Sequence, residues 1–206
     1  VDASGLELRM LAHYMNDKDY TNEVINGDIH TSNQVAAGLG SRDEAKTFIY
    51  AFIYGAGNKK IGTIIGGSER DGERVKEKFL RATPSLRRLR EKVERVAQRR
   101  WVRGLDQRKI IIRHPHAALN TLLQGAGACV MKKALTILQE YVINKQIKAF
   151  PVVNVHDEFQ YEVQEDRADE FGRLAVQSII DAGQQLNVRC QLNGEYKIGN
   201  NWSETH

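Results

Sequence analysis

The 206-residue sequence predicts an α+β fold. Several long stretches repeat apolar residues at the spacing of an α-helix, whereas the strand-like runs are few and short. These strands do not alternate with helices as they do in parallel βαβ units, so we expect antiparallel hairpins. Hydrophobic residues make up 41% and charged residues 27% of the chain, which is typical of a folded protein and argues against a disordered or fibrous one.

The N-terminal region predicts a strand end followed by two helices. Asp2-Ala3 is expected to end a strand, and residues 7–15 are apolar on one face, as in a short helix. A polar loop follows, and residues 28–39 then predict a second helix.

Residues 42–54 predict the best-defined helix. Ser41 is a suitable N-cap, Glu44 stands where it would complete a capping box, and the Gly-Ala-Gly run at residues 55–57 ends the helix. One face is expected to enter the core: Ala45, Phe48, Ile49, Phe52 and Ile53. The opposite face repeats polar and phenolic residues at every fourth position: Arg42, Lys46, Tyr50 and Tyr54. Two cations followed by two phenols suit a ligand with a polyphosphate at one end and planar rings at the other.

The middle of the chain predicts two more helices and a hairpin. A helix is expected over residues 69–82, after Gly66-Gly67. Thr83-Pro84 supplies an N-cap and an N1 proline for a basic helix that runs to about residue 100. Residues 101–113 predict a hairpin that turns near residues 104–106.

The last third predicts a long helix, a second hairpin and a final helix. The long helix spans about residues 118–144, and the final helix about residues 166–186. Between them, two strand-like runs at 152–155 and 159–163 are separated only by His156-Asp157-Glu158. This spacing predicts a hairpin with carboxylates at its tip. Such carboxylates are usually solvated turn residues, and that interpretation stays open from the spacing alone.

Basic residues are concentrated in one segment. Residues 70–113 contain 16 Lys or Arg and 6 Asp or Glu, whereas the rest of the chain contains 14 and 20. The segment therefore carries +10 and the remainder −6. This distribution favours a polyanionic partner, although a solvated pair of charged helices would show the same pattern.

The sequence also excludes some classes of protein. It contains no run of 18 apolar residues and no N-terminal secretory signal, so we expect a cytoplasmic protein without a membrane span. The two cysteines form no metal-binding spacing.

Three motifs resemble those of the family A DNA polymerases, in the order in which that family carries them. The resemblance to motifs A, B and C lies in Asp2-x-Ser4-x-x-Glu7-x-Arg9, Arg42-x3-Lys46-x3-Tyr50-x3-Tyr54-Gly55 and His156-Asp157-Glu158. Further matches are residues 27–31, Leu105-Asp106-x-Arg108 and Asn120-x3-Gln124. Motif A and residues 115–124 are most similar to the replicative enzymes of T-seven-like bacteriophages. One departure is Gln107, where the family usually has glycine in a turn.

By this resemblance the fold is that of a right-handed polymerase. It implies an antiparallel palm sheet with carboxylates at strand ends, together with helical fingers. Residues 1–41 and 101–206 would form the palm, and residues 42–100 the fingers. The thumb and the 3′–5′ exonuclease, which lie upstream of motif A in the family, have no counterpart in these residues.

The resemblance implies a two-metal mechanism. Asp2 and Asp157 would bridge two Mg²⁺ ions, with the Ala3 carbonyl as an extra ligand and Glu158 as an accessory carboxylate. The primer 3′-hydroxyl would attack the α-phosphorus of a dNTP, with pyrophosphate leaving. Lys46 would stabilise or protonate that pyrophosphate.

The resemblance also assigns ligand contacts. His30, Arg42 and Lys46 would bind the dNTP phosphates, and Glu7 with Tyr50 would close the space beneath the sugar. Asn120 and Gln124 could donate to minor-groove acceptors that every correct base pair presents. The remaining primer-template contacts would come from Tyr54, Arg113, His116 and His156.

The implied partners are a DNA primer-template, dNTPs and an upstream polymerase portion, with room for a processivity factor. Three alternatives stay open. A single-subunit RNA polymerase shares the palm, although Glu7 and Glu158 favour a DNA enzyme. A two-metal nuclease would use the same carboxylates without needing the stripe from Arg42 to Tyr54. The third alternative is a non-catalytic nucleic-acid-binding fragment, in which a palm and fingers without a thumb bind primer-template too weakly for turnover.

Overall fold

The computed structural model describes residues 1–205 and confirms the predicted α+β fold. The chain divides into two compact units. The first unit is built from residues 1–10 and the chain from residue 125 onward, and the second from residues 11–124. The division into palm and fingers stays a prediction.

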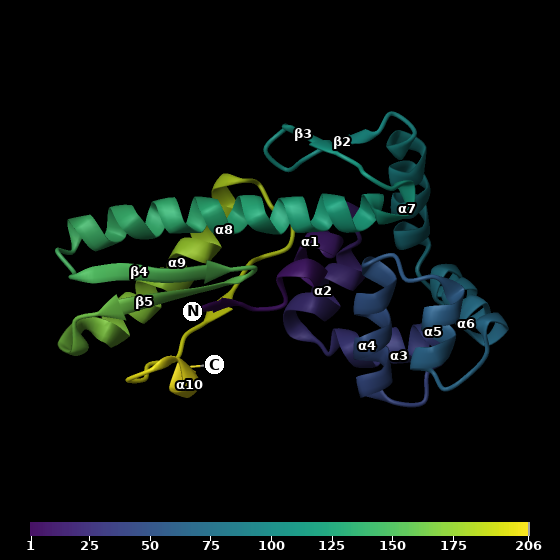
Figure 1. Ribbon diagram of the computed structural model, residues 1–206, viewed down its shortest axis with the longest axis horizontal. Coiled ribbons are helices and arrows are strands. Elements are labelled where there is room, and N and C mark those ends of the chain that lie inside the picture. The colour runs from purple at the N-terminus through teal and green to yellow at the C-terminus, as the bar shows by residue number, and fades with distance from the viewer. Residues whose placement is uncertain (206) are drawn as a thin grey trace. The chain divides into compact units, whose positions relative to one another are not determined.

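The first unit contains a four-stranded antiparallel sheet together with helices. Figure 1 shows the two long strands of this sheet, β4 and β5. The order of the strands is β4-β5-β1-β6, so the two-residue strand β1 lies between β5 and β6. The ring of Tyr161 on β5 lies 4.9 Å from that of Phe171, which attaches α9 to the sheet. The elements are β1 (Asp2–Ala3), β4 (Ala149–Val155), β5 (Glu158–Val163), a 3-10 turn (Glu165–Arg167), α9 (Ala168–Gln185), β6 (Gly194–Glu195) and α10 (Trp202–Thr205).

The β4–β5 hairpin turns more tightly than the sequence predicts. Val155 pairs with Glu158, which leaves only His156 and Asp157 in the loop. The prediction of a three-residue tip was therefore wrong by one residue, because Glu158 already belongs to β5. His156 has a φ of +54°, a left-handed conformation that a two-residue hairpin loop demands of at least one residue.

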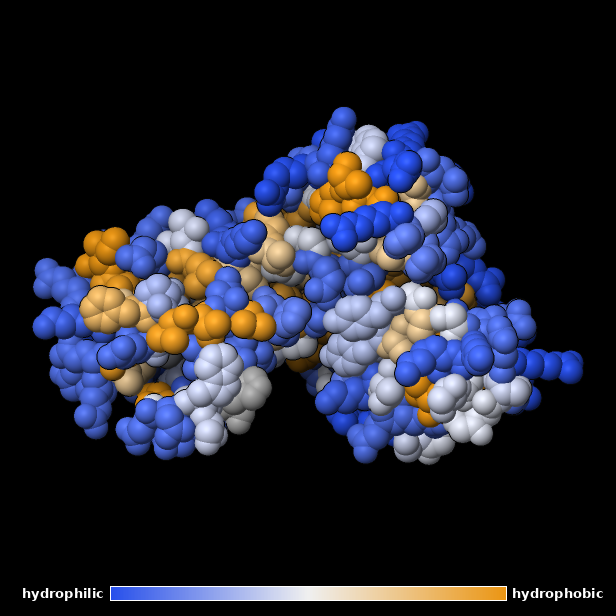
Figure 2. Space-filling model, viewed as in Figure 1, coloured by the Kyte–Doolittle hydropathy of each residue, from blue (hydrophilic) through white to orange (hydrophobic). Residues whose placement is uncertain are grey.

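The outer strand β4 carries apolar side chains at the surface. Phe150, Val152 and Val155 are exposed, as is Ile143 near the end of α8. Figure 2 shows this hydrophobic surface along β4.

The second unit is mostly helical, with a small two-stranded hairpin. Its elements are α2 (Lys18–Asn26), α3 (Ile29–Ala37), α4 (Arg42–Ile53), α5 (Asn58–Ile64), α6 (Glu69–Ala82), α7 (Pro84–Ala97), β2 (Trp101–Arg103), β3 (Lys109–Ile111) and a 3-10 turn (Pro115–Ala117). Two helices extend across the boundary between the units, namely α1 (Leu6–Met15) and α8 (Ala118–Asn144). None of the helices between residues 1 and 205 has the length and apolar character that crossing a bilayer requires.

Helix α4 is anchored by an aromatic cluster. All five residues of its predicted core face are buried. Phe79 of α6 contacts two of them edge-on, with ring centroids 5.2 Å from Phe48 and 5.6 Å from Phe52. Since Phe79 is fully buried, these contacts fix the face that α4 turns inward and hence the face that it leaves outside.

The ends of α4 are capped in two different ways. Ser41 accepts a hydrogen bond from the Glu44 N–H at 3.1 Å, as predicted, but the Glu44 carboxylate accepts from the Gly40 N–H and not from that of Ser41. The predicted capping box is thus only half formed. At the other end Gly55 adopts a φ of +81°, which glycine permits without steric cost.

Other local features differ from the sequence prediction. The expected polar loop contains α2, whose N-cap Asp17 accepts from the N–H groups of Asp19 and Tyr20. Pro84 takes the predicted first position of α7, but the Thr83 hydroxyl donates back to the Phe79 carbonyl instead of capping that helix.

Replacing Phe79 should test the anchoring of α4. Phe79→Ala removes a fully buried ring, so the free energy of unfolding should fall by about 3–5 kcal/mol. Phe79→Leu keeps most of the apolar volume and should cost much less. Chemical denaturation of both variants followed by circular dichroism measures the difference, and equal effects would contradict the edge-on packing.

Candidate active site

Asp2 and Asp157 meet in the first unit although 155 positions separate them in the sequence. The Ala3 N–H donates to the Asp157 carbonyl at 2.9 Å, and the Phe159 N–H donates to the Val1 carbonyl at 2.9 Å. Asp2 therefore lies directly opposite Glu158, the residue that follows Asp157. The buried side chains of Ala3 and Phe159 hold these two strands in the core.

The environment raises the pKa values of both aspartates. Burial raises the pKa of Asp2, and the charges of Asp157 and Glu158 raise it further. Burial also raises the pKa of Asp157, to which the charges of Glu7 and Glu158 add. Each ionised carboxylate is thus disfavoured by its neighbours, and a bound cation would relieve that repulsion.

The oxygen atoms of Asp2, Asp157 and Ala3 fit a magnesium ion that takes its remaining ligands from water and phosphate. Across residues 1–205, no three His, Cys, Asp or Glu side chains are grouped as a complete metal-binding set. Mg²⁺ commonly binds one or two protein carboxylates and completes its shell with water and phosphate oxygens. Asp2, Asp157 and the backbone of Ala3 suit that mode.

Further carboxylates surround this pair. Glu7 lies in the first turn of α1, and Glu158 accepts a hydrogen bond from the Gln160 side chain. Glu195 of β6 pairs with Asp2 of β1, and its charge also raises the pKa of Asp2. The sequence analysis missed Glu195, because a single Glu near the chain end gives no signal of a strand partner 193 positions away.

In the second unit, the outer face of α4 presents the predicted stripe. Arg42, Lys46 and Tyr54 are exposed, and Tyr50 is partly buried. Arg42 Nε donates to Asp28 Oδ2 at 2.7 Å, and this bond holds the pKa of Asp28 well below its usual range. Asp28 is also the N-cap of α3, so one carboxylate orders both the helix start and the guanidinium.

His30 joins this stripe from the first turn of α3. Its ring centroid lies 6.2 Å from that of Tyr50. Burial lowers the pKa of His30, and the positive charges of Arg42 and Lys46 lower it further. Its Nδ1 is buried and has no hydrogen-bond partner among the described residues. Three basic side chains thus converge on one surface, which suits an anion such as phosphate.

An amide side chain in the first turns of α8 contacts the last residue of the stripe. Gln124 Nε2 donates to the Tyr54 hydroxyl at 3.2 Å. Asn120 is one turn earlier on α8, and its Oδ1 is buried without a partner among residues 1–205. The Gln124 amide is thus held at the Tyr54 hydroxyl by the chain's own structure.

The other predicted nucleic-acid contacts are more scattered. Arg113 and His116 are exposed, and the His116 ring stacks on that of His114 with centroids 5.5 Å apart. His156 is exposed at the tip of the β4–β5 hairpin. Glu7 belongs to the first unit and Tyr50 to the second, so their pairing beneath a sugar stays a prediction.

Asp28 lies within the run 27–31 that the sequence analysis noted, but that analysis gave it no role in the site. A usable signal was present, since an aspartate directly before a helical pattern is a common N-cap. Its second role, holding Arg42 from 14 positions away, depends on how α3 and α4 pack.

Comparisons with known proteins agree with these observations. Residues 1–204 match the family described as DNA polymerase family A. The DNA-directed DNA polymerases of Enterobacteria phage T3 and Escherichia phage T7 are 43% and 42% identical to the chain over its full length. DNA polymerase I of Thermus filiformis is 29% identical over 98% of the chain.

The chain spans about a third of the length of the two phage relatives, or 33%. Among solved structures, it is similar to the POL domain of Pol1 from M. smegmatis in complex with DNA primer-template and dNTP. The TM-score is 0.78 at 20% identity, and the match covers 88% of this chain and 36% of the other. The full-length sequence match and the shared fold lead to one assignment: the chain belongs to DNA polymerase family A.

Proposed function

We propose that this chain carries the nucleotidyl-transfer site of a DNA polymerase, which adds dNTPs to a primer 3′-hydroxyl under the direction of a template. The observation that carries the proposal is the Asp2–Asp157 pair: β1 brings Asp2 beside the hairpin loop that holds Asp157, and burial together with nearby carboxylates raises both pKa values. In this proposal the antiparallel sheet belongs to a palm and α4 to the fingers. The similarity to the DNA-directed DNA polymerases of the two phages supports the same activity.

Asp2 and Asp157 would hold the metal ions, with the Ala3 carbonyl as a further ligand and Glu158 as an accessory carboxylate. When bound, two Mg²⁺ ions supply positive charge that lowers the pKa of the primer hydroxyl and stabilises the leaving pyrophosphate. The two aspartates are suited to this role because Asp2 lies on β1 and Asp157 in the adjoining β4–β5 loop, where the hydrogen bond from the Ala3 N–H to the Asp157 carbonyl keeps the two segments together.

The basic surface of the second unit would bind the dNTP phosphates. Arg42 and Lys46 offer charge-assisted hydrogen bonds, and the buried Nδ1 of His30 lacks a partner within the described chain. Lys46 would also donate a proton or a hydrogen bond to the departing pyrophosphate. Tyr50, next to His30, would meet the sugar together with Glu7.

The primer-template would contact a set of polar residues and the basic helix α7. Tyr54 would meet the template near the new base pair, and Asn120 with Gln124 would donate to minor-groove acceptors. Arg113, His116 and His156 would contact the strands at other points. The greater length of the relatives and the apolar surface of β4 support an upstream polymerase portion as another partner.

Single-turnover extension tests the proposal as a whole. The chain is placed in large excess over a labelled primer-template with Mg²⁺, so that weak DNA binding does not limit the reaction. Incorporation of the templated dNTP in preference to the rNTP supports the proposal. Preference for rNTP would indicate an RNA polymerase, shortening of the primer a nuclease, and binding without extension a non-catalytic fragment.

Removing either aspartate charge should abolish most of the chemistry. Asp2→Asn or Asp157→Asn should reduce the single-turnover rate by roughly a thousandfold or more, since several kcal/mol of charge stabilisation is lost. Primer-template affinity should change little. Because their pKa values are raised, Asp2 and Asp157 should become protonated at a higher pH than ordinary aspartates do. On acidification, Mg²⁺ affinity should therefore begin to fall at that higher pH. Asp166→Asn, at an exposed aspartate outside the site, is the control, and near-normal rates in the site variants would refute the metal assignment.

Lys46→Ala should impair the use of dNTP without affecting DNA binding. The lost charge-assisted hydrogen bond predicts a fall of about 10- to 100-fold in incorporation efficiency. Lys18→Ala removes the same charge from an exposed position on α2 and should behave like the parent. Rates measured across a dNTP series, with DNA affinity measured by fluorescence anisotropy, separate the two effects. A weaker DNA complex with unchanged dNTP use would contradict the assignment.

Tyr50→Phe should change sugar selection. The Tyr50 hydroxyl can replace the missing 3′-hydroxyl of a dideoxynucleotide, so its loss should increase discrimination against ddNTP. Tyr54→Phe removes the next phenol along the same stripe and should leave that discrimination unchanged. Competition between dNTP and ddNTP measures both variants, and equal selectivity in Tyr50→Phe and the parent would rule out this role.

A further inference from the structure

We propose that Lys76 is a positioning residue for Tyr54 and acts through the turn that ends α4. The two side chains belong to different helices of the second unit, and Lys76 is assigned no contact with a ligand. The effect on nucleotide use rests on the function proposed above, whereas the effect on the turn does not.

The turn after Tyr54 is defined by backbone hydrogen bonds. The Gly55 N–H donates to the Phe52 carbonyl at 3.0 Å, and the Ala56 N–H donates to the Ala51 carbonyl at 2.9 Å. With Gly55 in the left-handed conformation, this pair of bonds is a Schellman motif. A Cβ on Gly55 would lie 2.8 Å from the His116 carbonyl oxygen, so the turn also packs closely against the segment before α8.

Lys76 completes this turn from α6. Its ammonium donates to the Ala56 carbonyl at 3.0 Å, 20 positions earlier in the chain. The side chain is half-buried, and burial followed by the charge of Arg90 lowers its pKa, while Glu73 and Glu94 act in the opposite direction. A lysine held in this way is directed at a backbone carbonyl and not at solvent.

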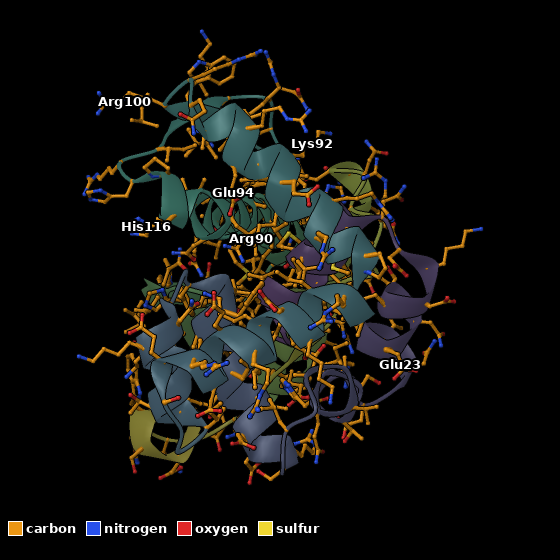
Figure 3. All side chains as sticks on the ribbon, turned by 90° about the vertical axis from the view of Figure 1, so that its right-hand side faces the viewer. Glu23, Arg90, Lys92, Glu94, Arg100 and His116 are labelled. Atoms are coloured by element: carbon orange, nitrogen blue, oxygen red, sulfur yellow. The ribbon has the colours of Figure 1, made fainter. Side chains whose placement is uncertain are left out.

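Charged residues surround Lys76 beside the turn. A cavity of about 190 Å³ lies beside the turn, and its lining includes Lys76, Arg90, Glu94 and His116. Arg90 lies over the Phe52 ring, with its guanidinium carbon 5.6 Å from the centroid, and forms an ion pair with Glu94. Figure 3 shows Arg90, Glu94 and His116 on this side of the molecule.

Tyr54 is therefore held from two directions. Gln124 donates to its hydroxyl, while Lys76 holds the backbone two residues further on. Because Tyr54 is the last residue before the left-handed Gly55, a change in the turn alters the backbone from which the phenol ring projects. Loss of the Lys76 bond leaves the Ala56 carbonyl without this partner and loosens one of the two restraints.

Hydrogen exchange of the intact 206-residue chain tests the effect on the turn. In Lys76→Met, which keeps the length of the stem but cannot donate, the amides of Gly55 and Ala56 should exchange about tenfold faster, because a net hydrogen bond is lost. Lys76→Arg can still donate and should restore much of the protection. Lys78→Met removes the same charge from an exposed position on α6 and is the matched control. Unchanged protection in Lys76→Met would overturn the proposal.

A double-mutant cycle tests the link to Tyr54. In single-turnover extension, Lys76→Met should raise the KM for dNTP about tenfold and change the maximal rate less than about threefold. The same substitution in a Tyr54→Ala background should have little further effect, because the residue through which it acts is gone. Additive effects would overturn the proposal. No effect of Tyr54→Ala, or no incorporation by the parent, would contradict the proposed function and not the role of Lys76. The hydrogen-exchange result would then still decide whether Lys76 holds the turn.

Discussion

Two carboxylates of like charge have to be kept together, and the first unit is organised around that constraint. The repulsion between Asp2, Asp157 and their acidic neighbours is opposed by the backbone hydrogen bonds of β1 with β5 and by the burial of Ala3 and Phe159. Arg9 adds to this from α1, where its buried guanidinium donates to the Ser4 carbonyl at 2.7 Å and to that of Gln191. Gly194 lets β6 approach closely, since a Cβ there would lie 2.9 Å from the Asp2 carbonyl oxygen.

The second unit meets a different requirement, namely to present several cations and phenols without burying them. Helix α4 achieves this because its inner face is buried, with the rings of Phe48 and Phe52 packed against Phe79. Neighbouring side chains then order the outer face. Asp28 forms an ion pair with Arg42 at one end, and Gln124 donates a hydrogen bond to Tyr54 at the other. The stripe is thus ordered by the chain's own contacts, which would lower the entropy lost if it bound the proposed ligand.

The sequence predicted the long elements, because their periodicity and spacing record them directly. The site residues were named from motifs that resemble those of the family, and their roles stay predictions. The sequence identified both faces of α4, the β4–β5 hairpin and the α+β class. It missed α2, because the apolar residues of that helix are too few to show a helical repeat. It also placed Glu158 in the hairpin loop, whereas Glu158 is the first residue of β5, because hairpin register depends on the loop conformation. Glu195 and Lys76 could not be found, since their partners are set by tertiary packing and not by neighbours in the chain.

The two-residue loop between β4 and β5 has a consequence for how such a sequence can vary. Asp157 occupies half of that loop, and the strands begin pairing on either side of it at Val155 and Glu158. Side chains alternate between the two faces of a sheet along each strand. One inserted residue that shifted the pairing by one position would therefore place the buried side chain of Phe159 on the opposite face of the sheet. Substitution at the loop leaves that pairing intact, whereas a change in length does not. The position of the Asp157 carboxylate therefore depends on the length of this loop as well as on the residue itself. Insertions during evolution would be accommodated in other loops.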